Sequence, residues 1–195
     1  MIITRIRDTV DTRLRQEQAG FRRGRGTIEQ IFSLRNIIEQ VIEWNANLYV
    51  CFVDLEKAFD SIDRGILWEI MRELGIPLKL ITMVKAMYEQ SKCAVVDGSG
   101  SYDWFDVKTG VKQSCCMSRF LFLLVIDWVM RRTIEGRRTE IRWQFENKLE
   151  DLDFADDVAL VASRIVDMQT KVENLNINGR KTGLKITLGK AVVMK

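Results

Sequence analysis

Three aspartates of this chain are placed where carboxylates could share a metal ion. Asp156 and Asp157 stand between two short apolar runs, a pattern typical of a β-hairpin with acidic residues at its tip. Asp54 follows the apolar run of residues 48–53, which predicts a buried strand that ends at this residue. Carboxylates at strand ends can jointly bind divalent cations, and two such cations support phosphoryl transfer. The alternative interpretation is structural, with Asp54 capping a helix and the other two forming a turn.

The composition removes several other kinds of catalysis. The 195 residues include no histidine, which excludes Ser-His-Asp and Cys-His mechanisms and His-ligated zinc. The four cysteines form no CxxC pair, and Cys115 and Cys116 are neighbours. We therefore expect a reduced, intracellular protein of the cytoplasm or nucleus that is not secreted. No apolar run approaches the roughly 20 residues of a membrane-spanning helix, so we expect no membrane partner.

Arginines are clustered, although the net charge is only +3. Such clusters often contact phosphate groups, and a solvated face is an equally good interpretation of either one. The first cluster is Arg22, Arg23 and Arg25, and the second is Arg131, Arg132, Arg137, Arg138 and Arg142.

Apolar residues recur at helical spacing in several segments. We expect helices at residues 27–44, 66–74, 118–132 and 165–181. Another helix should begin at Pro77, which suits a first helical turn. Its inner face should carry Leu80, Ile81, Val84, Met87 and Tyr88.

Two further segments predict hairpins. Residues 93–107 alternate in polarity around a turn at Asp97 and Gly98, and residues 149–162 provide the strands that flank the aspartate pair. Helices and antiparallel strands in this order predict an α+β domain whose acidic strands pack on helices.

Five segments, in order, resemble the conserved motifs of reverse transcriptases, and in particular those of non-LTR (LINE-class) retrotransposons. The similarity covers nearly the whole chain. The segments are EQAGFRRGRGTIEQI (residues 17–31, a fingers motif), FVDLEKAFDSIDR (52–64, motif A), GVKQSCCMSRFLF (110–122, a divergent motif B), LEDLDFADDVAL (149–160, motif C) and GLKITLGK (183–190, motif D).

The resemblance implies the fingers and palm of a right-hand polymerase, with an antiparallel palm sheet packed on helices. Residues 1–45 would be a partial fingers-side segment, and residues 46–195 the palm with fingers insertions, in one continuous domain. The thumb that grips the duplex is expected to be absent, because the similarity stops just after motif D.

The resemblance also implies roles for individual residues. Asp54, Asp156 and Asp157 would be catalytic carboxylates that bind two Mg²⁺ ions, or Mn²⁺ in their place. Phe59 falls at the steric gate that excludes a ribose 2′-hydroxyl, although an ordinary core aromatic is the alternative. The other implied nucleotide-binding residues are Arg22 for the triphosphate, Gln113 for the nucleotide pocket and template base, and Lys190, or else Lys185, as proton donor to pyrophosphate.

The implied function is RNA-directed DNA polymerisation, in which dNTPs are added to a primer 3′-hydroxyl on an RNA or DNA template. Two positions of motif B depart from the family pattern, with Ser114 for a glycine and Arg119 for a proline. In motif D, Thr187 and Ala191 replace Asn and Thr. A weak or inactive relic that keeps the fold and binds nucleic acid is therefore an alternative. An unrelated two-metal nuclease or phosphatase is a third, against which the Phe59 and Gln113 segments argue.

Overall fold

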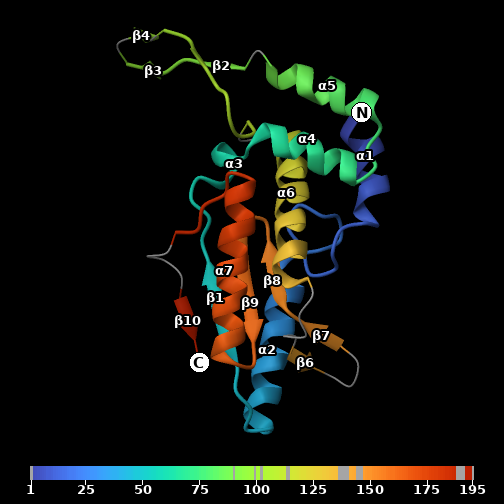
Figure 1. Cartoon of the computed structure of the whole chain (residues 1–195), viewed down its shortest axis with the longest axis vertical. Helices are drawn as coiled ribbons and strands as arrows, with labels where there is room; N and C mark the ends of the chain where they lie inside the picture. Colours follow the sequence, from blue (N-terminus) through green and yellow to red (C-terminus); the bar gives the residue numbers. More distant parts are fainter. Residues whose placement is uncertain are drawn as a thin grey trace.

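The computed structural model describes residues 2–89, 91–98, 100–101, 103–112, 115–135, 141–143, 147–187 and 192–194 (Figure 1). Its helices are α1 (Ile2–Asp11), α2 (Thr27–Glu43), α3 (Ala58–Ser61), α4 (Arg64–Glu73), α5 (Leu78–Glu89), α6 (Cys116–Ile134) and α7 (Ile165–Lys181). Its strands are β1 (Tyr49–Val53), β2 (Lys92–Cys93), β3 (Val96–Asp97), β4 (Gly100–Ser101), β5 (Phe105–Asp106), β6 (Ile141–Trp143), β7 (Asn147–Leu149), β8 (Asp151–Phe154), β9 (Asp157–Ala162) and β10 (Val192–Met194).

The largest sheet holds four antiparallel strands in the order β10-β1-β9-β8. β1 pairs with β9 along its whole length, and Val53 at its end lies opposite Val158. β8 and β9 form a hairpin that closes with Phe154 opposite Asp157. The predicted α+β architecture, an antiparallel sheet packed on helices, is confirmed.

The two faces of this sheet bury different sets of apolar side chains. Cys51, Val53 and Leu160 face the main core, which includes residues of α4, α6 and α7. Val50 and Val161 point to the opposite face and pack with residues of α2. This alternation along each strand places the sheet between two helical layers.

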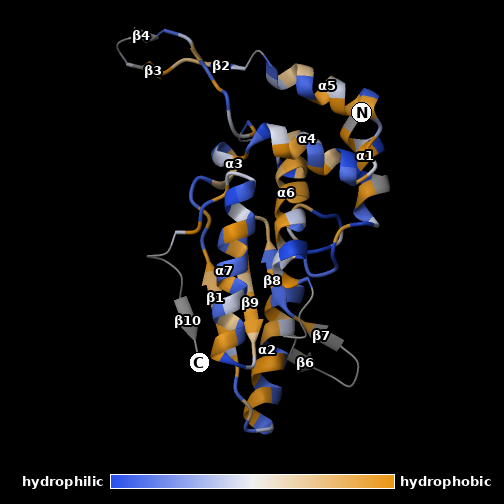
Figure 2. Cartoon of the chain, in the orientation of Figure 1, coloured by the Kyte–Doolittle hydropathy of each residue, from blue (hydrophilic) through white to orange (hydrophobic). Residues whose placement is uncertain are grey.

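α6 is the central helix of the main core. Its residues from Phe120 to Asp127 are all buried, so it is surrounded by protein around most of its circumference. Figure 2 shows apolar residues concentrated along α6 and β9. α4 begins beside α6 with Asp63 as its N-cap, whose carboxylate accepts from the Ile66 amide at 3.0 Å.

Two predicted details can be compared with the structure. Met87 is 48% exposed, so the inner face of α5 is formed by Ile81, Val84 and Tyr88 without it. The predicted turn at Asp97 and Gly98 is confirmed, because Asp97 ends β3 opposite Gly100 and Gly98 lies in the turn between them. The sequence pattern also does not predict α1, β6, β7 and β10, and the three strands among them, at three residues each, are too short for periodicity.

The segment between α5 and motif B extends away from the rest of the chain (Figure 1). β2 pairs with β5 at its base, and β3 pairs with β4 further out. Separately, none of the helices described here is long and apolar enough to cross a membrane.

Candidate active site

The three predicted catalytic aspartates lie at one end of the central sheet. Val53 is opposite Val158, so Asp54, the next residue after β1, lies beside Asp157 at the start of β9. Asp156 is in the two-residue turn between β8 and β9, where Ala155 takes a left-handed conformation with φ of 60°. The pKa of Asp157 is raised by partial burial and by the negative charges of Asp156 and Asp54. The three carboxylates therefore form one field of negative charge.

The fingers motif packs directly against the turn that carries Asp156. A Cβ atom at Gly20 would lie 2.0 Å from the Ala155 nitrogen and 2.7 Å from its Cα, so only glycine fits this contact. The Ala19 amide donates to the Asp153 carbonyl at 2.9 Å. The Gln30 side chain donates to the same carbonyl at 2.6 Å. Residues far apart in sequence thus fix the position of the motif C hairpin.

Motif D holds the backbone of motif A. The Thr187 amide donates to the Asp54 carbonyl at 2.9 Å, and the Glu56 amide donates to the Lys185 carbonyl at 2.8 Å. Gly183, with φ of 87°, approaches so closely that a Cβ atom would lie 2.1 Å from the Ser61 carbonyl oxygen. These contacts fix the turn that follows β1 and carries Asp54.

The start of motif B is fixed in the same way. The Gly110 amide donates to the Ile62 carbonyl and the Val111 amide to the Phe59 carbonyl, both at 2.8 Å. A Cβ atom at Gly110 would lie 2.5 Å from the Asp60 carbonyl oxygen. Motifs A, B and D therefore meet around the helical turn of α3.

Phe59 stands in an aromatic cluster at this junction. Its ring stacks on Phe122 of α6 at 4.5 Å between centroids, and Phe21 of the fingers motif meets it edge-on at 6.3 Å. The Arg119 guanidinium lies over the Phe21 ring at 5.9 Å. Phe59 is half-buried, so part of the ring packs on the core and part faces solvent. That placement is compatible with the gate role and with the core alternative.

Arg22 is buried, and its guanidinium bonds to neighbouring protein groups. Nε pairs with the Asp11 carboxylate at 2.8 Å, Nη1 donates to the Arg15 carbonyl at 2.6 Å, and Nη2 donates to the Asp11 carbonyl at 3.0 Å. These bonds tie the fingers motif to the end of α1. In the same arginine cluster, Arg23 is exposed.

The structure does not place every predicted site residue. Gln113 and Lys190 lie outside the described residues, as does Ser114 of motif B. The structure brings Asp54, Asp156 and Asp157 together. Phe59 is connected to them indirectly. Its ring contacts Phe21, and the preceding residue, Gly20, packs against the turn of the hairpin.

Sequence reasoning missed a buried charge cluster on β8. Arg15 Nη1 pairs with Asp151 at 2.6 Å, Nη2 pairs with Asp153, and the Arg15 amide donates to Asp127 at 2.8 Å. Arg131 completes the cluster by pairing with Asp127 at 2.7 Å. The sequence did contain one sign of this cluster. Asp151 and Asp153 stand at alternate positions of a buried strand, where carboxylates need a partner.

The pKa values in this buried cluster are strongly shifted. Burial and the neighbouring Asp151 raise the pKa of Asp153 well above its ordinary range, although Arg15 opposes the shift. Burial would lower the pKa of Arg15, but Asp153 and Asp151 raise it overall. Asp151 and Asp153 therefore share one positive partner, Arg15, in a site that is shielded from water.

The chemistry of the three sheet-end carboxylates suits a divalent cation. Within the described parts of the chain, no three His, Cys, Asp or Glu side chains are arranged as a ready metal site. Asp54, Asp156 and Asp157 nevertheless offer hard oxygen donors, and their mutual repulsion, visible in the raised Asp157 pKa, would be relieved by a cation. The residues present therefore fit the metal that the motifs imply.

Comparisons with known proteins agree with the motifs. The family model described as reverse transcriptase (RNA-dependent DNA polymerase) matches residues 1–195. The R2 retrotransposable element Pol polyprotein of Nasonia vitripennis is 28% identical over 161 residues, which is 83% of this chain and 15% of that protein. The R2DM polyprotein of Drosophila melanogaster is 28% identical over 143 residues, 73% of this chain and 13% of that protein. The chain thus spans about a seventh of the length of these relatives.

Solved structures show the same fold. Telomerase from Candida tropicalis, in complex with a fragment of telomeric RNA, superposes with a TM-score of 0.72 at 15% identity, over 99% of this chain and 33% of that one. Telomerase from Candida albicans gives a TM-score of 0.70 at 12% identity, over 100% of this chain and 33% of that one. With the family model matched from end to end, the chain belongs to the reverse transcriptase family, and it resembles the non-LTR retrotransposon members that its motifs indicated.

Proposed function

We propose that this chain forms the fingers and palm of an RNA-directed DNA polymerase that adds dNTPs to a primer 3′-hydroxyl. The observation that carries the proposal is the meeting of Asp54, Asp156 and Asp157 at one end of the sheet. Family membership supports the reaction class. We assign residues 1–45 to the fingers side and residues 46–195 to the palm with its fingers insertions.

In this proposal the three aspartates hold two divalent ions, Mg²⁺ or Mn²⁺, which would activate the 3′-hydroxyl and neutralise the triphosphate. The backbone bonds from Thr187 to Asp54 and from Ala19 to Asp153 hold the carboxylates on two rigid segments. Preorganisation of this kind lowers the cost of binding charged ligands at the reacting centre.

The remaining assignments concern the nucleotide. Phe59 would lie under the sugar and disfavour a 2′-hydroxyl, Gln113 would contact the nucleotide pocket, and Lys190 would protonate pyrophosphate. Arg22 would contribute to triphosphate binding, and its bonds to Asp11 and Arg15 support an additional role in shaping the fingers motif. An RNA template, a DNA primer and dNTPs are the proposed partners, and the proposed place of action is inside the cell.

Primer extension tests the proposal directly. A DNA primer annealed to an RNA template should be extended by the 195-residue chain with Mg²⁺ and dNTPs. Asp54→Asn and Asp156→Asn should each lower extension by about 10³-fold, because a bound metal contributes several kcal/mol of charge stabilisation. Asp103→Asn, at an exposed loop position, is the matched control and should leave extension unchanged. Extension that survives both site variants would refute the assignment.

The relic alternative rests on a specific observation at motif B. Arg119 stands where the family has proline and interacts with the Phe21 ring beside Phe59. If this arrangement prevents productive nucleotide binding, the unmodified chain should bind a primer-template without extending it. Extension by the unmodified chain would exclude the relic.

A further inference from the structure

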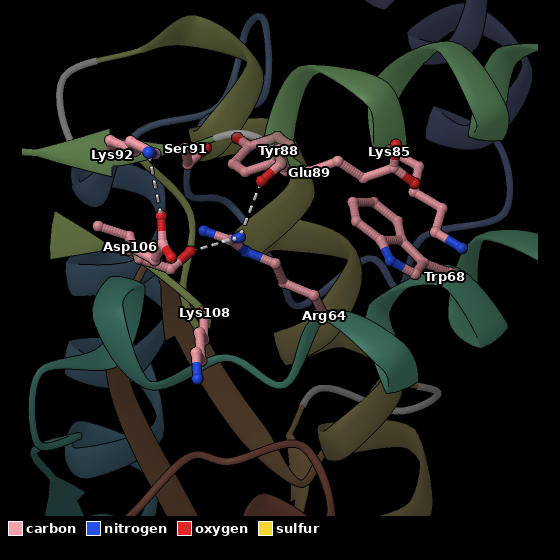
Figure 3. Close-up of a pocket in the computed structure, with 10 residues that line it drawn as sticks. Arg64, Trp68, Lys85, Tyr88, Glu89, Ser91, Lys92, Asp106 and Lys108 are labelled. Carbon is pink, nitrogen blue, oxygen red and sulfur yellow. Dashed lines mark hydrogen bonds and ion pairs between the residues drawn. The ribbon is translucent and has the colours of Figure 1, made fainter.

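A second candidate binding site lies outside the carboxylate end of the sheet. A pocket of about 750 Å³ is formed by α4, the end of α5 and the base of the β2–β5 segment (Figure 3). Its lining includes Arg64, Lys85, Lys92 and Lys108, with Glu89 and Asp106 as the acidic members. Four cationic side chains against two carboxylates leave a net charge of +2.

Arg64 places a positive charge at the centre of this pocket. Its guanidinium donates to the carbonyls of Gly110 and Val107 at 2.8 Å and of Tyr88 and Thr109 at 3.1 Å. Among the described residues it forms no ion pair with a carboxylate. Burial lowers the pKa of Arg64, which indicates a partly desolvated cation. Neutral carbonyls orient this charge without cancelling it.

The three lysines are available to a ligand. Lys85, Lys92 and Lys108 are exposed, and the Lys92 ammonium lies 3.9 Å from the Asp106 carboxylate, the limit of an ion pair. In Figure 3, Lys85 and Lys92 lie on opposite sides of Arg64. Cations are therefore spread across the pocket instead of being gathered at one point.

Ser91 lines the same pocket, but its hydroxyl oxygen is enclosed by the protein. The residue is only 8% exposed and its hydroxyl oxygen is buried, so the guanidinium and ammonium groups are the ones that would contact a ligand. Phosphate oxygens accept hydrogen bonds from both kinds of group.

We propose that this pocket binds the phosphate backbone of a nucleic-acid strand, as a contact separate from the aspartate site. A strand presents phosphates at regular intervals, which matches cations distributed on both sides of Arg64, whereas a single phosphate would use one end. RNA and DNA strands carry the same backbone phosphates, and contacts to them carry no sequence information, so both kinds of strand should bind equally well here. The proposal does not depend on polymerase activity.

Salt-dependent binding tests the proposal. Fluorescence anisotropy with a short labelled single-stranded RNA, and DNA of the same sequence, gives affinity between about 50 and 200 mM salt. Replacing Lys85, Lys92 and Lys108 together by Gln removes three contacts at about 0.7 each, so the slope of log K against log[salt] should become shallower by about 2. Affinity at low salt should fall at least about tenfold for both strands.

Lys85→Gln alone should make the slope shallower by about 0.7. Lys79→Gln is its matched control and should leave the slope unchanged, since both lysines are exposed on α5 and only Lys85 lines the pocket. Asp106→Asn should tighten binding about twofold or more, because it removes a negative charge near Lys92. The proposal would be overturned by an unchanged slope in the triple variant, or by a change in slope for Lys79→Gln as large as that for Lys85→Gln. Failure of the unmodified chain to bind either strand would also overturn it.

Failure of primer extension alone, with these binding effects intact, would refute the polymerase assignment and leave this site standing.

Discussion

The β8–β9 hairpin carries two pairs of aspartates with opposite surroundings. Asp151 and Asp153 are 0% exposed and pair with Arg15, whereas Asp156 and Asp157 lie at the tip and form no ion pair with any described residue. A carboxylate therefore supports the fold where the chain supplies its own cation. It is available for an external cation where the chain does not.

The contrast has an energetic basis. Buried carboxylates need a built-in countercharge because desolvation is costly, so their loss or orphaning destabilises the protein. At the hairpin tip, water stabilises the charges, and their mutual repulsion is tolerated until a cation binds. Loss of the countercharge should therefore destabilise the buried pair, whereas loss of one charge at the tip should not destabilise the chain.

The largest expected effect is on the stability of the buried pair. Arg15→Met leaves Asp127, Asp151 and Asp153 without their central cation and should lower the free energy of unfolding by about 3–5 kcal/mol. Urea denaturation followed by circular dichroism measures the change. The exposed Arg23→Met should stay within about 0.5 kcal/mol of the unmodified chain. Equal losses in both variants would contradict a structural role specific to the buried pair.

The next largest effect concerns the contact between the fingers motif and the turn of the β8–β9 hairpin. Gly20→Ala would place a Cβ atom 2.0 Å from the Ala155 nitrogen, and the backbone cannot yield without moving the hairpin tip. We expect a loss of about 1–3 kcal/mol in stability, together with lower primer extension. Gly98→Ala is the control, because nothing lies within 4 Å of its Cβ position. Normal extension by Gly20→Ala would show that the tip tolerates displacement.

The tip could be predicted from sequence more fully than the buried pair. Its strands are short apolar runs flanking acids, and the apolar run before Asp54 identified this residue as the third carboxylate, in agreement with the motif resemblance. The helices α2 and α7 follow from periodicity, with α2 ending one residue from the expected position and α7 matching it. All of these signals are local in the chain or belong to a motif.

The partners of the buried pair could not be found in this way. Arg15 meets Asp151 and Asp153 across more than a hundred residues, and no local pattern records that pairing. The Arg22 side chain illustrates the same limit, since its motif indicates phosphate whereas its bonds lie within the protein. Long-range packing decides which member of an arginine cluster is buried.

Acid should change the stability of the chain by a smaller amount. Because the pKa of Asp153 is raised in the folded state, the folded chain holds a proton between pH 3.8 and the folded pKa, whereas the unfolded chain releases it. The contribution of Asp153 to the free energy of unfolding is thus greatest below its ordinary pKa of 3.8, and it is lost as the pH rises through the pKa of the folded state. The slope contributed is at most about 1.4 kcal/mol per pH unit. Asp153→Asn should remove this pH dependence, whereas the control variant Asp103→Asn should retain it. Urea denaturation midpoints measured across a range of pH test both expectations.

The smallest effect should have the opposite sign. Asp157→Asn removes one of three mutually repelling carboxylates, so the free energy of unfolding should rise by about 0.5 kcal/mol at neutral pH. The same change removes a proposed metal ligand, so stabilisation by added Mn²⁺ should be smaller in the variant than in the unmodified chain. Thermal unfolding with and without Mn²⁺ measures both quantities, and Asp103→Asn should alter neither. A destabilised Asp157→Asn would mean that this carboxylate has a structural partner, and the distinction between tip and interior would then fail at Asp157.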